Sequence, residues 1–140
     1  MKRVVDVALC CDGKVLLCLE QVAHSPGELY WIPPGGKIEP GEDDFAAICR
    51  ELEEELGITS AMLAERGIIP RRYCEHRGDW HGDQIVVQHF IAKLDEPLPF
   101  KLLVGQRDSV WTSVPPSGGS IPTFTETLMI YLELGGYLYQ

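Results

Sequence analysis

The feature that most constrains this chain is a double glycine followed by a strongly acidic, helix-forming segment. Gly35-Gly36 opens the stretch, and Gly57 stands where a glycine commonly ends a helix. Residues 43–56 contain neither proline nor glycine, and they begin with two aspartates, which the positive end of a helix dipole favours. The stretch therefore predicts a permissive backbone turn that leads into a helix over about residues 43–56.

Three glutamates of this predicted helix share one side. At about 100° per residue, Glu55 lies about 40° and Glu54 about 60° from Glu51, in opposite directions. Arg50, four residues before Glu54, stands at the edge of the group as a counter-charge. Most charged helix faces are simply solvated, but clustered carboxylates also bind hard divalent cations. Gly36 would let a backbone carbonyl approach such an ion, so a solvated face and a metal site remain as alternatives at this point.

The same helical wheel predicts which residues of the helix are buried. Glu53, about 200° from Glu51, is predicted to point to solvent. The residues predicted to pack against the core lie between about 100° and 160° and are Phe45, Cys49, Leu52 and Leu56. The carboxylates and the apolar stripe are thus expected on separate sides of the helix.

The rest of the chain predicts strands mixed with helices in a single domain, residues 1–140. Asp12-Gly13 suits the tight turn of a β-hairpin, and Gly135-Gly136 would end a final helix. Antiparallel hairpins combined with helices favour an α+β or mixed α/β fold. The predicted strands are residues 4–11, 14–20, 68–76, 84–94 and 109–114, loops cover residues 21–30 and 77–83, and the final helix covers about residues 122–134.

Composition limits the classes of partner. The net charge is −9 in 140 residues, which argues against a surface for nucleic acid or an anionic membrane. Phosphate-bearing substrates remain compatible with this charge if divalent cations lie between them and the protein. No run approaches the roughly 18 apolar residues of a membrane span. The five cysteines lack the spacing of a zinc site and are predicted to be thiols in a reducing compartment, the cytoplasm.

The acidic segment resembles the signature of a known family, the Nudix box. That signature is glycine, five residues, glutamate, seven residues, and then arginine-glutamate-apolar-any-glutamate-glutamate-any-glycine-apolar. Every specified position is matched without a gap by Gly36, Glu42, Arg50, Glu51, Leu52, Glu54, Glu55, Gly57 and Ile58. The order of the predicted elements around the segment is also similar to the family fold.

The resemblance implies an α/β/α sandwich with a mixed β-sheet. It also implies hydrolysis of a nucleoside diphosphate linked to another group, with Mg²⁺ or Mn²⁺ as the cofactor. By position, Glu54 and Glu55 would be metal ligands, and Glu51 would be a third ligand or the base that activates water. Gly36 would offer its carbonyl oxygen to the metal, and Arg50 would orient a glutamate.

Other residues are weaker candidates for the site. Glu42 would give electrostatic or water-mediated help, and Lys37 would bind phosphate in the loop beside the metal. Arg71 and Arg72 are also phosphate candidates, but neighbours on a strand face opposite sides, so at most one points into the site. We select Arg72 for this role. Phe124 would stack on a base or pack in the core.

The substrate is a small-molecule nucleotide, and its class remains open at this stage. Our first prediction is a nucleoside triphosphate, hydrolysed to the monophosphate by a monomer or homodimer. An ADP-ribose or sugar-nucleotide hydrolase (compare Pro70) and a dinucleoside polyphosphate hydrolase (compare Tyr73) are alternatives by the same resemblance. A catalytically silent nucleotide-binding domain is the alternative of another class. A further glutamate or aspartate from outside the box would come from Glu75, Glu96 or Asp108.

Overall fold

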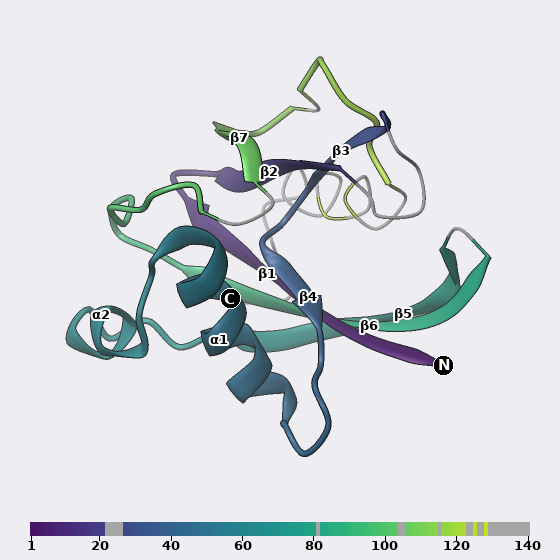
Figure 1. Ribbon diagram of the computed structural model, residues 1–140. Coiled ribbons are helices and arrows are strands. Elements are labelled where there is room, and N and C mark those ends of the chain that lie inside the picture. Colours follow the sequence, from purple (N-terminus) through teal and green to yellow (C-terminus); the bar gives the residue numbers. More distant parts are fainter. Residues whose placement is uncertain are drawn as a thin grey trace.

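A computed structural model describes residues 1–21, 27–80, 82–103, 106–114 and 116–122, together with residues 125 and 128. This part of the chain forms a mixed β-sheet with two helices (Figure 1). The elements are β1 (Lys2–Cys11), β2 (Lys14–Gln21), β3 (Leu29–Ile32), β4 (Gly35–Lys37), α1 (Asp44–Leu56), α2 (Ser60–Glu65), β5 (Arg71–Trp80), β6 (Asp83–Lys93) and β7 (Gln106–Thr112).

The sheet is organised around β1, which pairs with strands of both directions. β1 runs parallel to β6 over its length and antiparallel to β4, and it meets β2 only at the hairpin turn. β2 then diverges from β1 and pairs with β3 and β7 instead. Figure 1 shows β2, β3 and β7 above and β1, β4, β5 and β6 below. The prediction of a mixed sheet in an α+β fold is therefore confirmed.

Glycines with positive φ form two turns of the chain, as the sequence predicts. Asp12 and Gly13 both have positive φ, 52° and 72°, as a two-residue hairpin turn with right-handed strand twist requires. At the other turn, Gly57 closes α1 in the left-handed conformation and donates its N–H to the carbonyls of Glu53 and Leu52. Asp43 caps the opposite end of this helix by accepting a hydrogen bond of 2.7 Å from the N–H of Ala46.

Three local predictions are corrected. The loop predicted over residues 77–83 is wrong, because β5 continues to Trp80 and pairs with β6 beyond the point where β1 begins. The backbone of this segment is hydrogen-bonded to β6, although its side chains are polar. The polar composition therefore predicted a loop where the structure has a strand. The helix α2 and the short strands β3 and β4 were not predicted. β3 begins within the predicted loop over residues 21–30, and β4 lies in the predicted glycine turn.

The buried face of α1 differs from the predicted one. Phe45 is 50% exposed, because it lies in the first turn, away from the core. The buried arc is centred nearer the carboxylates than expected, and Glu55 lies within it. The residues of α1 that are buried are Ala47, Ile48, Leu52, Glu55 and Leu56. The apolar stripe and the acidic side of the helix therefore adjoin instead of facing apart.

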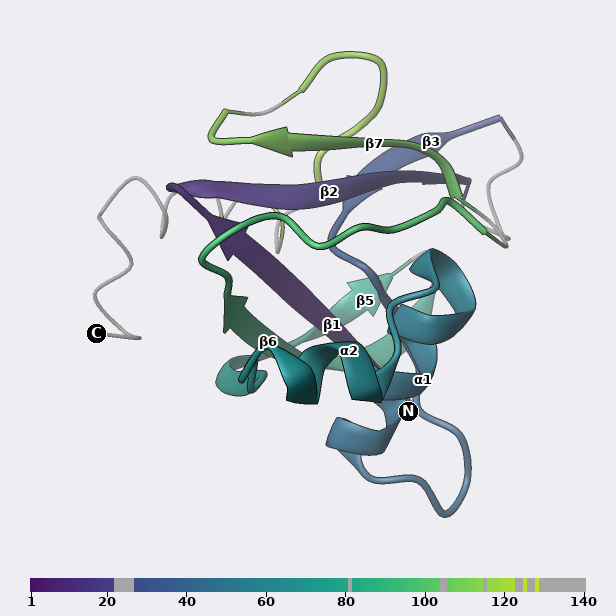
Figure 2. The same ribbon diagram turned by 90° about the vertical axis from the view of Figure 1, so that its left-hand side faces the viewer.

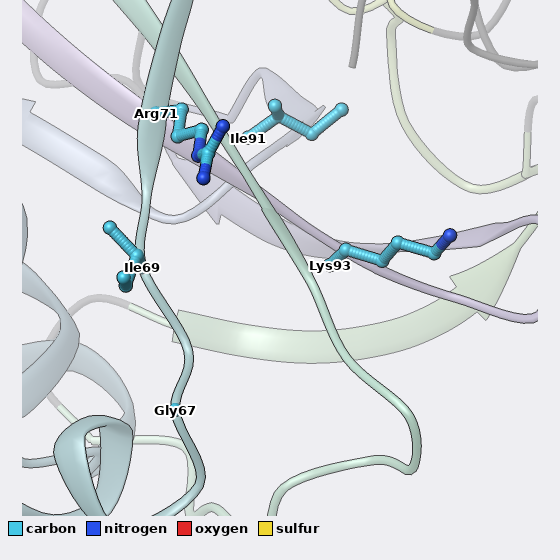
Figure 3. A pocket seen from close by; sticks show the side chains of 5 residues that line it. All are labelled: Gly67, Ile69, Arg71, Ile91 and Lys93. Carbon is cyan, nitrogen blue, oxygen red and sulfur yellow. The ribbon is translucent and has the colours of Figure 1, made fainter. Parts of the chain in front are cut away.

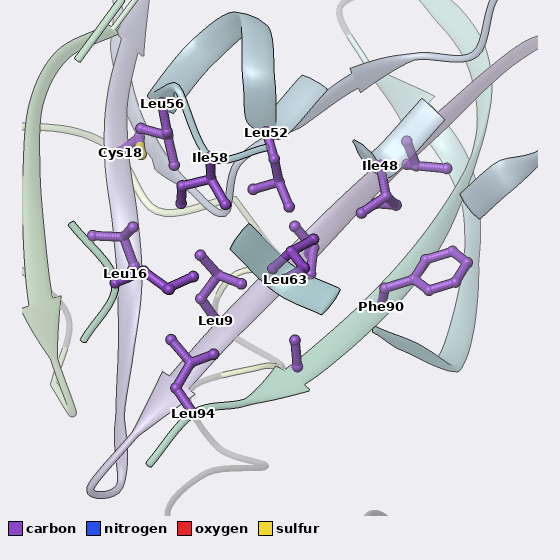
Figure 4. Close-up of a cluster of buried hydrophobic side chains, with 14 of the residues drawn as sticks. Leu9, Leu16, Cys18, Ile48, Leu52, Leu56, Ile58, Leu63, Phe90 and Leu94 are labelled. Atoms are coloured by element: carbon purple, nitrogen blue, oxygen red, sulfur yellow. The ribbon is translucent and has the colours of Figure 1, made fainter. Parts of the chain in front are cut away.

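The hydrophobic core has one part on each face of the sheet. Ile48 and Leu52 of α1 and Leu63 of α2 pack against Val7 and Leu9 of β1 (Figure 4). Both helices thus cover the same face, and Figure 2 shows them together beside β1 and β6. No helix in the described ranges has the length and apolar character needed to cross a membrane.

The opposite face carries the second part of the core. Leu128 is buried there and packs in one cluster with Ala8, Cys10 and Ile91. Thr125 and Leu128 are both helical, but most of the helix predicted over residues 122–134 lies outside the described residues. The same holds for Phe124, one of the residues predicted to bind substrate.

Candidate functional site

Gly35 and Gly36 of β4 lie close to different neighbours. A β-carbon at Gly35 would collide with the carbonyl oxygen of Val5 on the neighbouring strand β1. A β-carbon at Gly36 would instead lie against the carboxylate of Glu51, at 2.6 Å from its Cδ. A side chain at position 36 would therefore displace the Glu51 carboxylate from its place beside β4.

Arg50 connects the glutamates of the helix to the loop before it. Its Nε and Nη2 donate to the two carboxylate oxygens of Glu42 at 2.7 and 2.9 Å. Nη1 donates to Glu51 at 2.9 Å and to Glu54 at 3.2 Å, and Nη2 also donates to the carbonyl of Lys37 at 2.9 Å. These bonds lower the pKa of Glu42 to about 2 and raise that of the Arg50 guanidinium. The prediction that Arg50 reaches Glu54 is confirmed, and Glu42 serves to hold the loop against the helix.

Glu55 is the buried member of the carboxylate group, with only 6% of the residue exposed. Burial raises its pKa to about 10, and the neighbouring carboxylates of Glu20 and Glu51 act in the same direction. A backbone hydrogen bond from Gly35 opposes this shift. Glu55 also shares a hydrogen bond with Glu51, which raises the pKa of Glu55 further.

The donor set suits a hard divalent cation. Glu51 and Glu55 stand beside the backbone of Gly35-Gly36, and the Glu54 side chain is 56% exposed at the edge of the group. All of these donors are oxygens, as Mg²⁺ and Mn²⁺ prefer. Within the described ranges, no three or more acidic, histidine or cysteine side chains are already arranged to hold a metal ion. In this structure Glu51 and Glu54 instead share Arg50 as their counter-charge.

Lys37 and Arg72, two of the residues predicted to bind phosphate, lie on different strands. Lys37 is exposed on β4, directly after Gly36. Arg72 lies on the face of the sheet that α1 covers, donates to Gln88 at 3.2 Å and stands 3.8 Å from a carboxylate oxygen of Asp44. Arg72 is therefore on the same side of the sheet as the glutamates of α1. Lys37 pairs with Val4 of β1, so by strand alternation its side chain faces the other side from Gly36.

Arg71 lies on the other face of the sheet, as the strand alternation predicted. It pairs across the ladder with Ile91, which belongs to the core cluster opposite α1. The two residues line a pocket of about 270 Å³ together with Gly67, Ile69 and Lys93 (Figure 3). Arg71 is thereby separated by the sheet from the carboxylates of α1.

The carboxylate that comes to Glu55 from outside the box is Glu20, which sequence reasoning missed. The three residues considered for this role have other neighbours. Glu75 accepts hydrogen bonds from Arg77 and Gln88, Glu96 pairs with Arg66, and Asp108 is exposed on β7. The available signal was the alternation of β2, because Leu16, Cys18 and Glu20 follow one another on the same side of the strand.

A second buried polar pair lies on the face opposite α1. The Nδ1 of His89 on β6 is 2.7 Å from the Oδ1 of Asp6 on β1, and both residues are buried. Burial raises the pKa of Asp6, although His89 opposes the shift. The parallel register that brings His89 to Asp6 is not visible in the sequence.

Arg50→Lys is expected to lower the melting temperature in EDTA by several degrees. A lysine keeps the charge but cannot bind Glu42 with two parallel hydrogen bonds while also reaching Glu51 and the Lys37 carbonyl. Arg66→Lys is the matched control, since Arg66 makes one exposed ion pair with Glu96 and should hardly change the melt. Equal melting temperatures for the two variants would contradict a stabilising role of the Arg50 contacts.

Comparisons with known proteins show which family the chain resembles. A model of the NUDIX domain matches residues 1–115. The asymmetrical bis(5'-nucleosyl)-tetraphosphatase of Caenorhabditis elegans is 33% identical over 86 residues, which are 61% of this chain and 58% of that protein. The CTP pyrophosphohydrolase of Escherichia coli is 35% identical over 97 residues, which are 64% of this chain and 71% of that protein. The match to the worm relative thus spans little more than half of that protein.

Solved structures show the same fold. A MutT protein from Methanosarcina mazei superimposes with a TM-score of 0.73 at 17% identity, over 96% of this chain and 94% of that one. A MutT Nudix hydrolase from Burkholderia pseudomallei gives a TM-score of 0.68 at 20% identity, over 92% and 95% of the two chains. The family model covers most of the chain, including the whole of β4 and α1. On these grounds the chain belongs to the Nudix family.

Proposed function

We propose that the protein is a pyrophosphohydrolase that depends on Mg²⁺ or Mn²⁺ and acts on a nucleoside diphosphate linked to another group. Nucleoside triphosphates are the first candidates, with release of the nucleoside monophosphate. The observation that supports this most is the contact of the Glu51 carboxylate with the backbone of Gly36, beside the buried Glu55. A solvated acidic face would not bury a carboxyl group such as that of Glu55.

The residues that would hold the cation are Glu54, Glu55, Glu51 and the carbonyl of Gly36. A bound divalent cation would polarise the pyrophosphate and lower the pKa of a bound water molecule. Arg50 keeps Glu51 and Glu54 oriented, because it donates to both from one guanidinium nitrogen. Glu51 would act either as a ligand or as the base that accepts a proton from the attacking water.

The phosphates away from the cation would be bound by basic residues, Lys37 and Arg72. Lys37 follows Gly36 directly, and Arg72 stands beside the first turn of α1. Their positive charge is needed because the chain carries a net charge of −9 and the substrate is a polyanion. Phe124 stays a prediction for stacking on the base.

A dinucleoside polyphosphate is the second candidate substrate. The similarity to the C. elegans protein named as a bis(5'-nucleosyl)-tetraphosphatase favours it, whereas the E. coli protein named as a CTP pyrophosphohydrolase favours a nucleoside triphosphate. A silent nucleotide-binding domain is disfavoured, because every carboxylate of the box is present. We also propose a single domain and a cytoplasmic location, which the five free cysteines suit.

The products decide between these reactions. We expect a nucleoside triphosphate to give monophosphate and pyrophosphate, and a dinucleoside polyphosphate to give two nucleotides, with no orthophosphate as the first product. The measurement is chromatography of a panel of triphosphates, dinucleoside polyphosphates, ADP-ribose and sugar nucleotides after incubation with Mg²⁺. Appearance of diphosphate together with orthophosphate would contradict the proposed pyrophosphohydrolase.

A further inference from the structure

The last turn of α1 is unfavourable by its own composition. It contains Glu53, Glu54 and Glu55, and no basic residue lies in it. The C-terminal end of a helix is the negative end of its dipole, where basic side chains are favourable and acidic ones are not. The last four carbonyl groups of a helix also lack partners within the helix, and such ends fray. This turn therefore needs hydrogen-bond donors from elsewhere in the fold.

The segment of residues 99–103, between β6 and β7, supplies two of these donors. The N–H of Leu103 donates to the carbonyl of Glu55 at 2.8 Å. The N–H of Lys101 donates to the carbonyl of Leu56 at 3.0 Å. The 99–103 segment thus holds the end of α1 from a part of the chain that is distant in sequence.

Packing supports these hydrogen bonds only in part. Phe100 packs against the core between α1 and the sheet, but Leu103 is 43% exposed. A pocket of about 380 Å³ remains where the segment meets the helix, with Leu56 on one side and Pro99 on the other. The contact of Leu103 with α1 therefore depends mainly on its hydrogen bond to the carbonyl of Glu55.

Glu55 is fixed through both its backbone and its side chain. Leu103 binds its carbonyl oxygen, and the backbone of Gly35 donates a hydrogen bond to its carboxylate. Glu55 thereby connects the 99–103 segment with β4, where the carbonyl of Gly36 would be another oxygen donor. A metal ligand has to be held within roughly 0.5 Å of its productive position, and fraying of the last turn would move Glu55 farther than this.

We propose that the 99–103 segment positions the last turn of α1 for the divalent cation, with the N–H of Leu103 as the group that fixes Glu55. The proposal rests on the proposed function, because the cation and its ligands are part of it. Leu103 acts through Glu55 and supplies no ligand of its own. The coupling is reciprocal, so a cation bound by the glutamates also holds the segment against the helix.

The test replaces Leu103 by proline, which has no N–H to donate. Leu103→Pro should weaken the binding of Mn²⁺ to the full chain by about tenfold, as the loss of a group that orients a metal ligand commonly does. Free Mn²⁺ is followed by electron paramagnetic resonance in the absence of substrate. Leu102→Pro is the matched control, because Leu102 lies in the same segment and its N–H is not one of the two donors to α1. Its affinity for Mn²⁺ should stay within about twofold of the wild type.

Amide hydrogen exchange of the wild type tests the same coupling without a substitution. Saturating Mg²⁺ should slow the exchange of the Leu103 N–H by about tenfold, because the coupling changes both equilibria by the same factor. The N–H of Leu102 is the internal reference, and its exchange should change much less.

The outcomes separate this inference from the proposed function. Binding of Mn²⁺ by folded Leu103→Pro as tight as by the wild type, even with a lower melting temperature in EDTA, would overturn the inference alone. Equal losses of affinity in the two proline variants would also overturn it. If Leu103→Pro does not fold, the exchange experiment decides, and a Leu103 amide that Mg²⁺ leaves unchanged overturns the inference. A wild-type protein that binds neither cation would overturn the metal site of the proposed function, and the inference with it.

Discussion

Glu54→Gln and Glu55→Gln are each expected to lower the turnover number by at least about 100-fold. Each change replaces a charged oxygen donor by a neutral amide of the same shape. Glu55 holds a proton in the metal-free protein at neutral pH, because burial raises its pKa to about 10. A glutamine there resembles the state that the metal-free fold already prefers. The loss of activity should therefore occur without loss of the fold, as steady-state kinetics and thermal melts of the same samples would show.

Glu53→Gln is the matched control for both variants. Glu53 lies between the other glutamates in the sequence, but it is exposed on the far side of α1. Its described role is a backbone one, since its carbonyl accepts the N–H of Gly57. Its turnover number should stay within about twofold of the wild type, as for most surface substitutions. Equal losses at Glu53 and Glu54 would mean that helix geometry does not decide which carboxylates act.

The fold could be predicted where a residue type has one strong local preference. Asp12-Gly13 adopts the positive φ angles of a hairpin turn, and Gly57 ends α1 in the left-handed conformation. Phe45 shows the limit of this reasoning, because a helical wheel gives directions but not the position where the core ends. Its direction on the helical wheel is that of the core residues, yet in the first turn of α1 it is 50% exposed.

The candidate site could be predicted only within residues 36–58, where sequence spacing is also spatial spacing. Arg50 and Glu54 are one helical turn apart, so their hydrogen bond follows from the sequence. Glu20 lies more than 30 residues from Glu55, and its position depends on how β2 diverges from β1. Asp6 and His89 meet through a parallel register that no local pattern encodes. Long-range pairing was thus the missing information in both cases.

The metal-free protein is expected to lose stability as the pH rises from about 5 to 9, and a divalent cation should reverse this loss. A carboxyl group whose folded pKa is about 10, against an ordinary value of 4.5, stabilises the fold fully below pH 4.5. This contribution falls as the pH rises, because the unfolded chain ionises Glu55 freely and the folded chain does not. Glu42, whose pKa is lowered to about 2, affects the stability only below its ordinary pKa of 4.5. It therefore does not contribute to the change between pH 5 and 9.

A cation that binds only the folded protein stabilises it by about 2.7 kcal/mol when present at a hundred times its Kd. Millimolar Mg²⁺ or Mn²⁺ should therefore raise the melting temperature at pH 8. The increase should be much smaller at pH 5, because protons and the cation compete for the same oxygens. Thermal melts at the two pH values, each with EDTA and with the cation, measure both effects.

The double variant Glu54→Gln/Glu55→Gln separates this site from other buried groups. Burial also raises the pKa of Asp6, so part of the pH dependence of the wild type would come from the opposite face of the sheet. The double variant keeps Asp6 but removes the carboxylates of the site. It should melt above the wild type in EDTA at pH 8 and gain little from the cation. If saturating cation leaves the wild-type melt at pH 8 unchanged, the carboxylates of α1 do not bind metal in the free protein, and a solvated acidic face becomes the better description of Glu51 and Glu54.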